Sequence, residues 1–480
     1  MSKRFGPVLL LGSLSAVSGC VQGPDYERPT VTVPDDFRFQ DATASFEADQ
    51  GVWWQAFGDP TLDALVGEAL ASNRDLRIAS ARVDEAAAIV SGTRSQGLPQ
   101  VGYGAQASRQ RTSEPGSGAF VGETQSSIGG VLTASWEIDL WGRIARETEA
   151  ARANLFATEE ARRGVTLTLI SSVIVGYLNL LDLDERLRIS EETVEGRREY
   201  VELFRKRLRG GVISDFEMAQ ILAEYETTLA SLPELRRQIA LQEDALSVLL
   251  GRNPGPIERP TTLGAIAAPE VPGGLPSELL TRRPDVLQAE QNLVAANAMI
   301  GAVRAQYFPR ISLTSVLGLA SAALNGLFAG SARTWSFAGE LAGPIYTGGG
   351  LEAATAQTLA RRDQALAAYE LTVQNAFRDT EDALVSLQTA GEVEQTQLRR
   401  VVALEDAVRL ARLRYDNGYS DTLDLLDTER GLLSAQLSQT AARADRYRAL
   451  VSLYRALGGD WVDEAEIEAD APATQAGGLP

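Results

Sequence analysis

Two carboxylates near the end of the chain are spaced to lie on one face of a helix. Asp424 and Asp427 stand three residues apart, so one face of a helix would carry both. If several copies surrounded a narrow pore, each aspartate would form a ring that holds cations and repels anions. Leu423, one turn before Asp427, would add an apolar constriction. The alternative is that both aspartates solvate a helix start, where aspartate is common.

The side chains that most enzymes need are absent from the sequence. The 480 residues contain no histidine and a single cysteine, Cys20. Without histidine there is no Ser-His-Asp or Cys-His catalysis and no imidazole metal site. One cysteine leaves no intrachain disulfide and no thiolate cluster. We therefore expect no enzyme, no metal and no cofactor, although a carboxylate enzyme such as a glycosidase stays open as an alternative.

The charge balance is strongly acidic. There are 45 Lys and Arg against 64 Asp and Glu, a net charge of −19. Nucleic-acid binding depends on clustered basic side chains that release counterions, so this balance argues against it. It suits a surface or lumen that repels anions, or it serves solubility alone.

The N-terminus has the pattern of a lipoprotein signal peptide. Residues 1–19 combine a basic start with an apolar run that is too short to span a bilayer. The segment Val17–Cys20 resembles a bacterial lipobox, which predicts acylation of Cys20 and a tether to the membrane. A buried free cysteine is the alternative. Val21 stands where an aspartate would resemble the signal for inner-membrane retention, so delivery to the outer membrane is favoured.

The mature chain contains a tandem repeat. We expect an N-terminal arm at residues 20–58, two copies at 59–252 and 275–461, a linker at 253–274 and a flexible tail at 462–480. Motifs that recur at offsets of 210, 207 and 207 residues indicate the duplication: Gly97–Val101 and Tyr307–Ile311, Gly211–Asp215 and Gly418–Asp421, Leu249–Gly251 and Ala456–Gly458.

Each copy contains a pair of alternating segments. Strands are predicted at about 100–112 and 125–140, and again at about 309–320 and 333–346, with an apolar face and a small or polar face. This alternation suits membrane barrel strands, but an ordinary half-buried sheet has the same pattern. Four strands cannot close a barrel, and open edges are not tolerated in lipid. If the strands lie in a membrane, several subunits must share one barrel.

Long helices follow the strands in each copy. They are predicted at about 142–209, 214–250, 349–416 and 421–457, in two stretches that are almost free of proline. About 65 residues at ~1.5 Å each reach ~100 Å, which suits a coiled coil or helical barrel rather than a single globule. Pro233 is expected to kink its helix.

Several motifs in this order resemble the TolC-like outer-membrane efflux proteins, and the lipobox points to their lipoprotein branch, the NodT or OprM type. The resemblance covers Trp53 to Trp461, and its most specific pieces are the duplication, Trp136–Arg143, Arg414–Gly418, Leu423–Asp427 and Ala456–Trp461. It implies a mainly α-helical trimer in the outer membrane of a Gram-negative bacterium. Each subunit would give four strands to a twelve-stranded transmembrane β-barrel and its long helices to an α-helical barrel in the periplasm.

The same resemblance implies a passive channel for efflux, including multidrug resistance, or for type I secretion. Its partners would be a periplasmic adaptor (membrane fusion protein) and an inner-membrane pump of the RND type. A periplasmic adaptor protein and a non-conducting coiled-coil scaffold are the rival interpretations. The exported substrate is not encoded in any motif.

A periplasmic gate is also implied by the resemblance. Asp424 and Asp427 match the aspartate rings of the family, and Leu423 matches an apolar residue of the lipoprotein branch. Tyr415 would donate a hydrogen bond to Asp215, a lock between helix pairs that contributes roughly 1–3 kcal/mol.

One departure from the family pattern concerns an arginine that often reinforces this lock. The candidate positions hold Asp416 and Ser420, and Arg412 or Arg414 are the possible substitutes. The turns that carry these residues would face the adaptor, through Gly211, Val212, Ser214, Gly418 and Ser420. The alternative is that the glycines serve only the turns.

Overall fold

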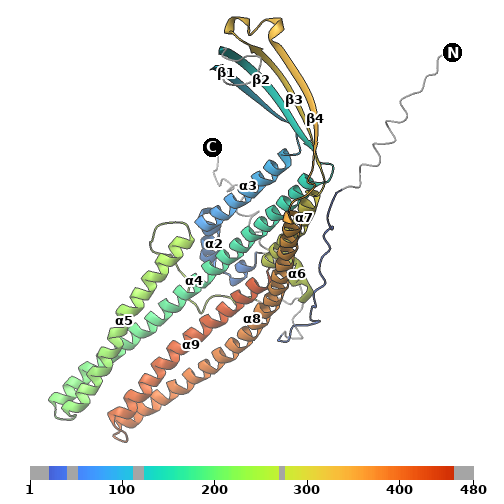
Figure 1. The fold of residues 1–480 in the computed structure, drawn as a ribbon. Coiled ribbons are helices and arrows are strands. Elements are labelled where there is room, and N and C mark those ends of the chain that lie inside the picture. The colour runs from blue at the N-terminus through green and yellow to red at the C-terminus, as the bar shows by residue number, and fades with distance from the viewer. Residues whose placement is uncertain (1–20, 40–51, 112–123, 270–275, 459–480) are drawn as a thin grey trace, which may run out of the picture. The chain divides into compact units, whose positions relative to one another are not determined.

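The computed structural model describes residues 21–39, 52–111, 124–269 and 276–458 (Figure 1). The signal peptide, Cys20, the first interstrand loop and the C-terminal tail lie outside these residues. The chain divides into two compact units, which are described separately. The first unit contains residues 1–30, 82–159 and 288–370, and the second contains 31–81, 160–287 and 371–480.

The first unit contains a four-stranded antiparallel sheet. Its strands are β1 (Gln100–Arg111), β2 (Thr124–Ile138), β3 (Arg310–Ser321) and β4 (Arg333–Ala342), in the order β1-β2-β3-β4 (Figure 1). The bounds of β1 and β3 lie within one residue of those expected, whereas β2 ends two residues and β4 four residues before the expected end. Each repeat supplies two strands, and β1 and β4 form the edges. Two short 3-10 helices stand between β3 and β4: η3 (Leu324–Gly326) and η4 (Gly330–Ala332).

The register places the large apolar residues of the four strands on one face, except Val131 and Val316, which lie on the other. Leu132 of β2 lies opposite Tyr103 of β1 and Leu317 of β3, and Leu317 lies opposite Trp335 of β4. Directly paired residues share a face, so the four predicted apolar rows form one continuous surface. Tyr103 is 91% exposed and Trp335 is 78% exposed, so the chain itself leaves this face uncovered. The opposite face is small and polar, with Thr133, Ser135, Glu137, Ser312, Thr314, Thr334, Ser336 and Glu340.

Residues 21–30, the described start of the arm, are held within the first unit by polar contacts. Tyr26 Oη donates to Glu290 Oε1 at 3.1 Å, and Arg28 Nη2 pairs with Glu290 Oε2 at 2.7 Å. Gly23 has φ +98°, and a Cβ there would lie only 2.4 Å from the Cα of Gly301. The arm can lie this close to Gly301 only because residue 23 is also a glycine.

Two very long helices dominate the chain. These are α4 (Arg143–Arg209) and α8 (Gly350–Asp416), each of 67 residues, and both contain residues of both units. The same is true of α3 (Arg74–Ser95) and α7 (Pro284–Ala305). The remaining helices belong to the second unit: η1 (Trp53–Phe57), α2 (Pro60–Ser72), α5 (Asp215–Leu249), η2 (Pro276–Glu278), α6 (Leu279–Arg282) and α9 (Thr422–Leu457). The α5 helix continues through Pro233, and the kink expected there stays a prediction.

The core of the second unit is built around aromatic residues of η1. Trp53, Trp54 and Phe57 are buried, and Trp53 stacks on Tyr454 with ring centroids 4.6 Å apart. One 18-residue window of α4 is apolar enough to cross a membrane, yet 67% of it is buried. A core helix explains that composition, because this part of α4 contributes Ile170, Ile174, Leu178 and Leu181 to the same cluster.

The recurring Leu-Gly motif marks the end of the last helix in each copy. In the first copy, Asn73 Nδ2 donates to the carbonyl oxygen of Leu249 at 2.8 Å. Gly251 has φ +73°, and a Cβ there would lie 2.2 Å from the carbonyl oxygen of Ser72. The glycine therefore allows the chain to turn against the start of α3.

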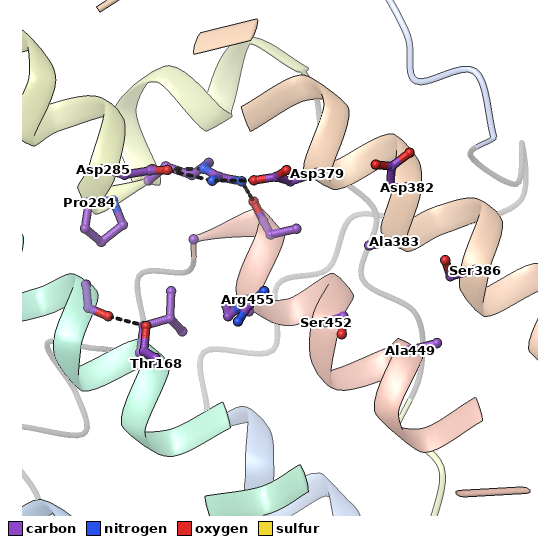
Figure 2. A pocket seen from close by; sticks show the side chains of 15 residues that line it. Thr168, Pro284, Asp285, Asp379, Asp382, Ala383, Ser386, Ala449, Ser452 and Arg455 are labelled. Atoms are coloured by element: carbon purple, nitrogen blue, oxygen red, sulfur yellow. Dashed lines mark hydrogen bonds and ion pairs between the residues drawn. The ribbon is translucent and has the colours of Figure 1, made fainter. Parts of the chain in front are cut away.

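In the second copy, a different side chain donates to the carbonyl oxygen at the helix end. Arg283, 210 residues after Asn73, donates from Nη1 to the carbonyl oxygen of Ala456 at 2.8 Å. Its other nitrogens bind Asp285 at 2.7 and 3.0 Å and Asp379 at 3.3 Å (Figure 2). In both copies, a side chain at the start of one long helix thus caps the end of another.

A buried hydrogen bond joins the start of α2 to α4. Asp59 caps α2, since its Oδ1 accepts from the N–H of Thr61 at 2.8 Å. Its Oδ2 accepts from Tyr177 Oη at 2.6 Å. Burial, followed by the bond to Asp59, raises the pKa of Tyr177, so the hydroxyl stays protonated and can donate.

We predict that Tyr177→Phe lowers the free energy of unfolding by about 1–3 kcal/mol, because it leaves a buried carboxylate oxygen without its donor. Thermal unfolding of the detergent-solubilised protein measures the effect. Tyr346→Phe is the matched control, since Tyr346 is 89% exposed. Equal midpoints for the two variants would contradict a stabilising role of the buried bond.

Candidate functional site

The candidate site lies in the second unit, at the turns that end two helical hairpins. Residues 210–214 join α4 to α5, and residues 417–421 join α8 to α9. Gly211 and Gly418 have φ of +72° and +75°. In each turn the next residue donates its N–H to a carbonyl five residues earlier, at 2.9 and 2.8 Å. Both hairpins therefore reverse through the same glycine-dependent helix end.

The helices that leave the two turns begin with matching caps. Ser214 caps α5 in a reciprocal capping box with Glu217, whose pKa is lowered chiefly by the Ser214 N–H. Asp421, 207 residues later, caps α9 by accepting from the N–H of Asp424 at 3.0 Å. Asp424 therefore lies in the first helical turn, where the helix-start interpretation placed it.

The three predicted pore residues are exposed at the start of α9. Leu423 is 53% exposed, and the side chain of Asp427 is 77% exposed. Asp424 is also exposed, and none of the three contributes to the core of the hairpin. Asp427 Oδ1 lies 3.6 Å from Arg430 Nη1 on the next turn. These side chains are thus accessible in a single chain.

Tyr415 packs against the first hairpin through its ring. It stacks on Phe204 with centroids 5.7 Å apart, and the Arg207 guanidinium lies over both rings at 5.2 and 5.6 Å. Asp215 is the exposed first residue of α5. Within the described part of one chain, Tyr415 and Asp215 form no hydrogen bond with each other, so the lock between them stays a prediction.

Two polar contacts that the sequence did not suggest join the hairpins at their turns. Thr422 Oγ1 donates to Glu217 Oε1 at 3.2 Å. Arg207 Nη2 lies 3.7 Å from Asp416 Oδ1, so the arginine comes from the first hairpin and the acid from the second. For the first contact, the duplication could have drawn attention to Thr422, because this residue occupies the position equivalent to Asp215.

The two arginines proposed as substitutes in the lock are placed differently. Arg412 Nη2 pairs with Glu429 of the same hairpin at 3.2 Å, and its guanidinium lies 5.1 Å from the Tyr200 ring centroid. Burial, more than the nearby Glu429, raises the pKa of Tyr200 to about 12. Arg414 is exposed and makes no ion pair within the described residues. Arg412 thus reaches the first hairpin through the Tyr200 ring, and within the described residues neither arginine forms an ion pair with that hairpin.

A buried arginine organises a further bridge. Arg197 of α4 is 7% exposed and donates from Nη1 to the carbonyl oxygen of Glu224 at 2.6 Å and to Thr228 Oγ1 at 2.5 Å. The side chain of Glu224 then accepts from Arg430 of α9 at 2.5 Å. Beside this bridge, apolar residues of both hairpins form one cluster: Val201, Phe204, Ile221 and Leu426.

The residues predicted to face an adaptor lie on the outside of the turns. Val212 is 73% exposed, and Gly211, Ser214 and Gly418 are also exposed. Ser420 is half-buried, and its hydroxyl oxygen has no hydrogen-bond partner in the described structure. The turns therefore offer accessible surface, while Ser420 lies partly beneath it.

Elsewhere in the second unit, two aspartates that line a cavity bind a buried arginine. A cavity of about 450 Å³ is lined by Asp285, Asp379 and Arg283 (Figure 2). The two aspartates hold the buried Arg283 guanidinium in place. Within the described residues, no group of three His, Cys, Asp or Glu side chains could hold a metal ion.

Comparison with known proteins gives one consistent result. The profile of a family described as outer membrane efflux protein matches residues 65–252 and 275–459, which lie within the two predicted copies. The toluene efflux pump outer membrane protein TtgC of Pseudomonas putida is 35% identical over 93% of this chain and 94% of its own. The cation efflux system protein CusC of Escherichia coli is 34% identical over 93% and 97%.

A solved structure shows the same fold. The open state of the outer membrane channel MtrE of Neisseria gonorrhoeae matches with a TM-score of 0.82 and 32% identity. The match covers 92% of this chain and 98% of that structure. The mainly helical architecture with a small antiparallel sheet is therefore that of solved outer-membrane channels.

We predict that Arg197→Met destabilises the protein by about 2 kcal/mol, because the carbonyl of Glu224 and the Thr228 hydroxyl lose a charged donor. The neighbouring Arg198→Met is the control. Arg198 is an exposed residue paired with Glu195, and its loss is expected to leave the stability close to that of the wild type. Thermal unfolding compares them, and equal losses would contradict the bridging role of Arg197.

Proposed function

Since this chain belongs to the outer membrane efflux protein family, we propose that three copies of it form a passive conduit through the outer membrane. Substrates enter from an inner-membrane pump of the RND type, through a periplasmic adaptor, and leave at the cell exterior. The members of this family are channels rather than enzymes, and no catalytic step is assigned to this chain.

The observation that carries the proposal is the uncovered apolar face of the sheet. A surface with Tyr103, Leu317 and Trp335 exposed is stable in lipid, whereas the opposite polar face suits a water-filled lumen. The edge strands β1 and β4 each have one unpaired side, which lipid does not tolerate.

Pairing of β4 with β1 of a neighbouring copy removes both edges. Two copies would make eight strands, a barrel whose interior side chains fill, whereas three make twelve and leave room for a channel. A non-conducting scaffold or an adaptor is not favoured, because such a protein has no need for strand pairs with one apolar face in both repeats.

The start of the arm supports a lipid anchor at Cys20. Val21 lies against Gly142, where a Cβ would be 2.8 Å from Val21 Cγ1. Gly142 follows the end of β2 by four residues, so the acylated cysteine would be held close to the end of the sheet. A chain fixed in this way lets the acyl groups enter the periplasmic leaflet beside the barrel.

The exported substrate is assigned to the pump rather than to this chain. The relative named for toluene efflux and the relative named for cation efflux are nearly equally similar to it, at 35% and 34% identity. A tunnel that conducts without binding its cargo fits both chemistries.

The periplasmic gate is placed at the two hairpin turns. Leu423, Asp424 and Asp427 would line the narrow end in the trimer, and their exposure in one chain supports this. The lock from Tyr415 to Asp215 would form in the closed trimer. The adaptor would open it by contacting the exposed turns, since a ligand shifts such an equilibrium by its differential affinity for the two states.

The membrane assignment predicts opposite outcomes for two arginine substitutions in adjoining strands. Leu317→Arg places a charge on the lipid face and should destabilise the inserted trimer by about 2–4 kcal/mol. Ser336→Arg lies on the polar face and should leave a stable trimer. Heat resistance of the trimer after extraction from outer membranes measures both. Equal tolerance of the two changes would argue against a lipid-facing sheet.

The gate assignment predicts distinct channel phenotypes in planar bilayers. Tyr415→Phe should raise the single-channel conductance, because the lock loses its donor. Asp427→Ala should lower the preference for cations, because the ring loses its charge. Asp406→Ala, an exposed α8 carboxylate paired with Arg409, is the control and should behave as wild type. Unchanged conductance and selectivity in both gate variants would contradict the assignment.

A further inference from the structure

Arg430 lies between the pore aspartate and the other hairpin. Its Nη1 is 3.6 Å from Asp427 Oδ1, one turn away on the same face of α9. Its Nη2 donates to Glu224 Oε1 of α5 at 2.5 Å. The two nitrogens of one guanidinium are thus shared between a carboxylate of each hairpin, a geometry that the planar arginine fork permits.

The partner on the first hairpin is held from behind. The side chain of Glu224 is only 17% exposed, and the buried Arg197 binds both its carbonyl oxygen and, at 3.2 Å, its carboxylate. Arg430 and Asp427, by contrast, are 53% and 77% exposed. Arg197 and Glu224 therefore balance each other's charge and hold Arg430 in position. Arg430 and Asp427 form the pair that is exposed to solvent.

We propose that Arg430 is a selectivity-determining residue, which masks the Asp427 carboxylate while Glu224 holds it in place. At this level the exposed side chains present one positive and one negative charge per subunit, rather than a bare ring of three carboxylates. Asp424, one turn earlier, has no such counterpart among its described contacts and would supply the cation preference of the entrance.

The inference rests on the proposed channel function, because a mask matters only where Asp427 lines the pore. A double variant distinguishes the effect of the total charge from the effect of where that charge lies. If only the total charge mattered, removing Arg430 and Glu224 together would restore wild-type selectivity. If the mask matters, the double variant keeps the selectivity of the Arg430 variant, since Glu224 lies behind the exposed pair.

The test is the reversal potential of purified trimers in planar bilayers under a KCl gradient. Arg430→Gln should raise the ratio of potassium to chloride permeability by roughly threefold, the change that an uncompensated charge a few ångströms away produces in water. Arg430→Lys keeps the charge and should stay near wild type. Asp427→Asn should lower this ratio, because it leaves Arg430 unmatched, and adding Arg430→Gln should bring the ratio back near the wild-type value.

Arg237→Gln is the matched control, since it removes an exposed arginine that pairs with Glu234 three residues away on α5. The mask is refuted if Arg430→Gln leaves the permeability ratio unchanged in a conducting trimer, or if Asp427→Asn with Arg430→Gln stays far from the wild-type ratio. Wild-type restoration by Arg430→Gln with Glu224→Gln would also refute it. A wild-type protein that forms no pore would instead contradict the proposed function itself.

Discussion

Unpaired backbone at the two edges of the sheet is the constraint on which the rest of this protein depends. Each repeat supplies one hairpin of strands, and the two hairpins join through β2 and β3, leaving β1 and β4 open. In lipid those N–H and C=O groups must find partners in another copy. The exposed apolar face requires lipid on one side, and the polar face requires water on the other. Sheet chemistry alone therefore implies an assembly.

The two copies satisfy the same backbone groups with different residues. The helix ends at Gly251 and Gly458 are both capped by a side chain from the start of another long helix, yet one cap is an amide and the other a guanidinium. The two hairpin turns share a left-handed glycine and a side-chain cap. What recurs is the need to satisfy backbone groups where helices end, and that need is local.

The hairpin turns differ where they meet each other. Thr422 with Glu217, Arg207 with Asp416 and Arg430 with Glu224 all join the first copy to the second. Most of these groups are partly exposed, so each pair contributes modestly to stability. Contacts of this size can break and reform, which suits the opening that we propose for this junction.

Helices, strands and turns could be predicted from the amino-acid sequence, because their causes are local. Proline-free stretches indicate the helices, a period of two indicates the strands, glycine marks the turns, and a constant offset reveals the duplication. The order of the strands and the pairing of the charges became known from the folded chain. Arg430 and Glu224 are 206 residues apart, and their pairing follows from how two hairpins pack. No local pattern carries that information, because the spacing between partners depends on the fold rather than on the period of a helix.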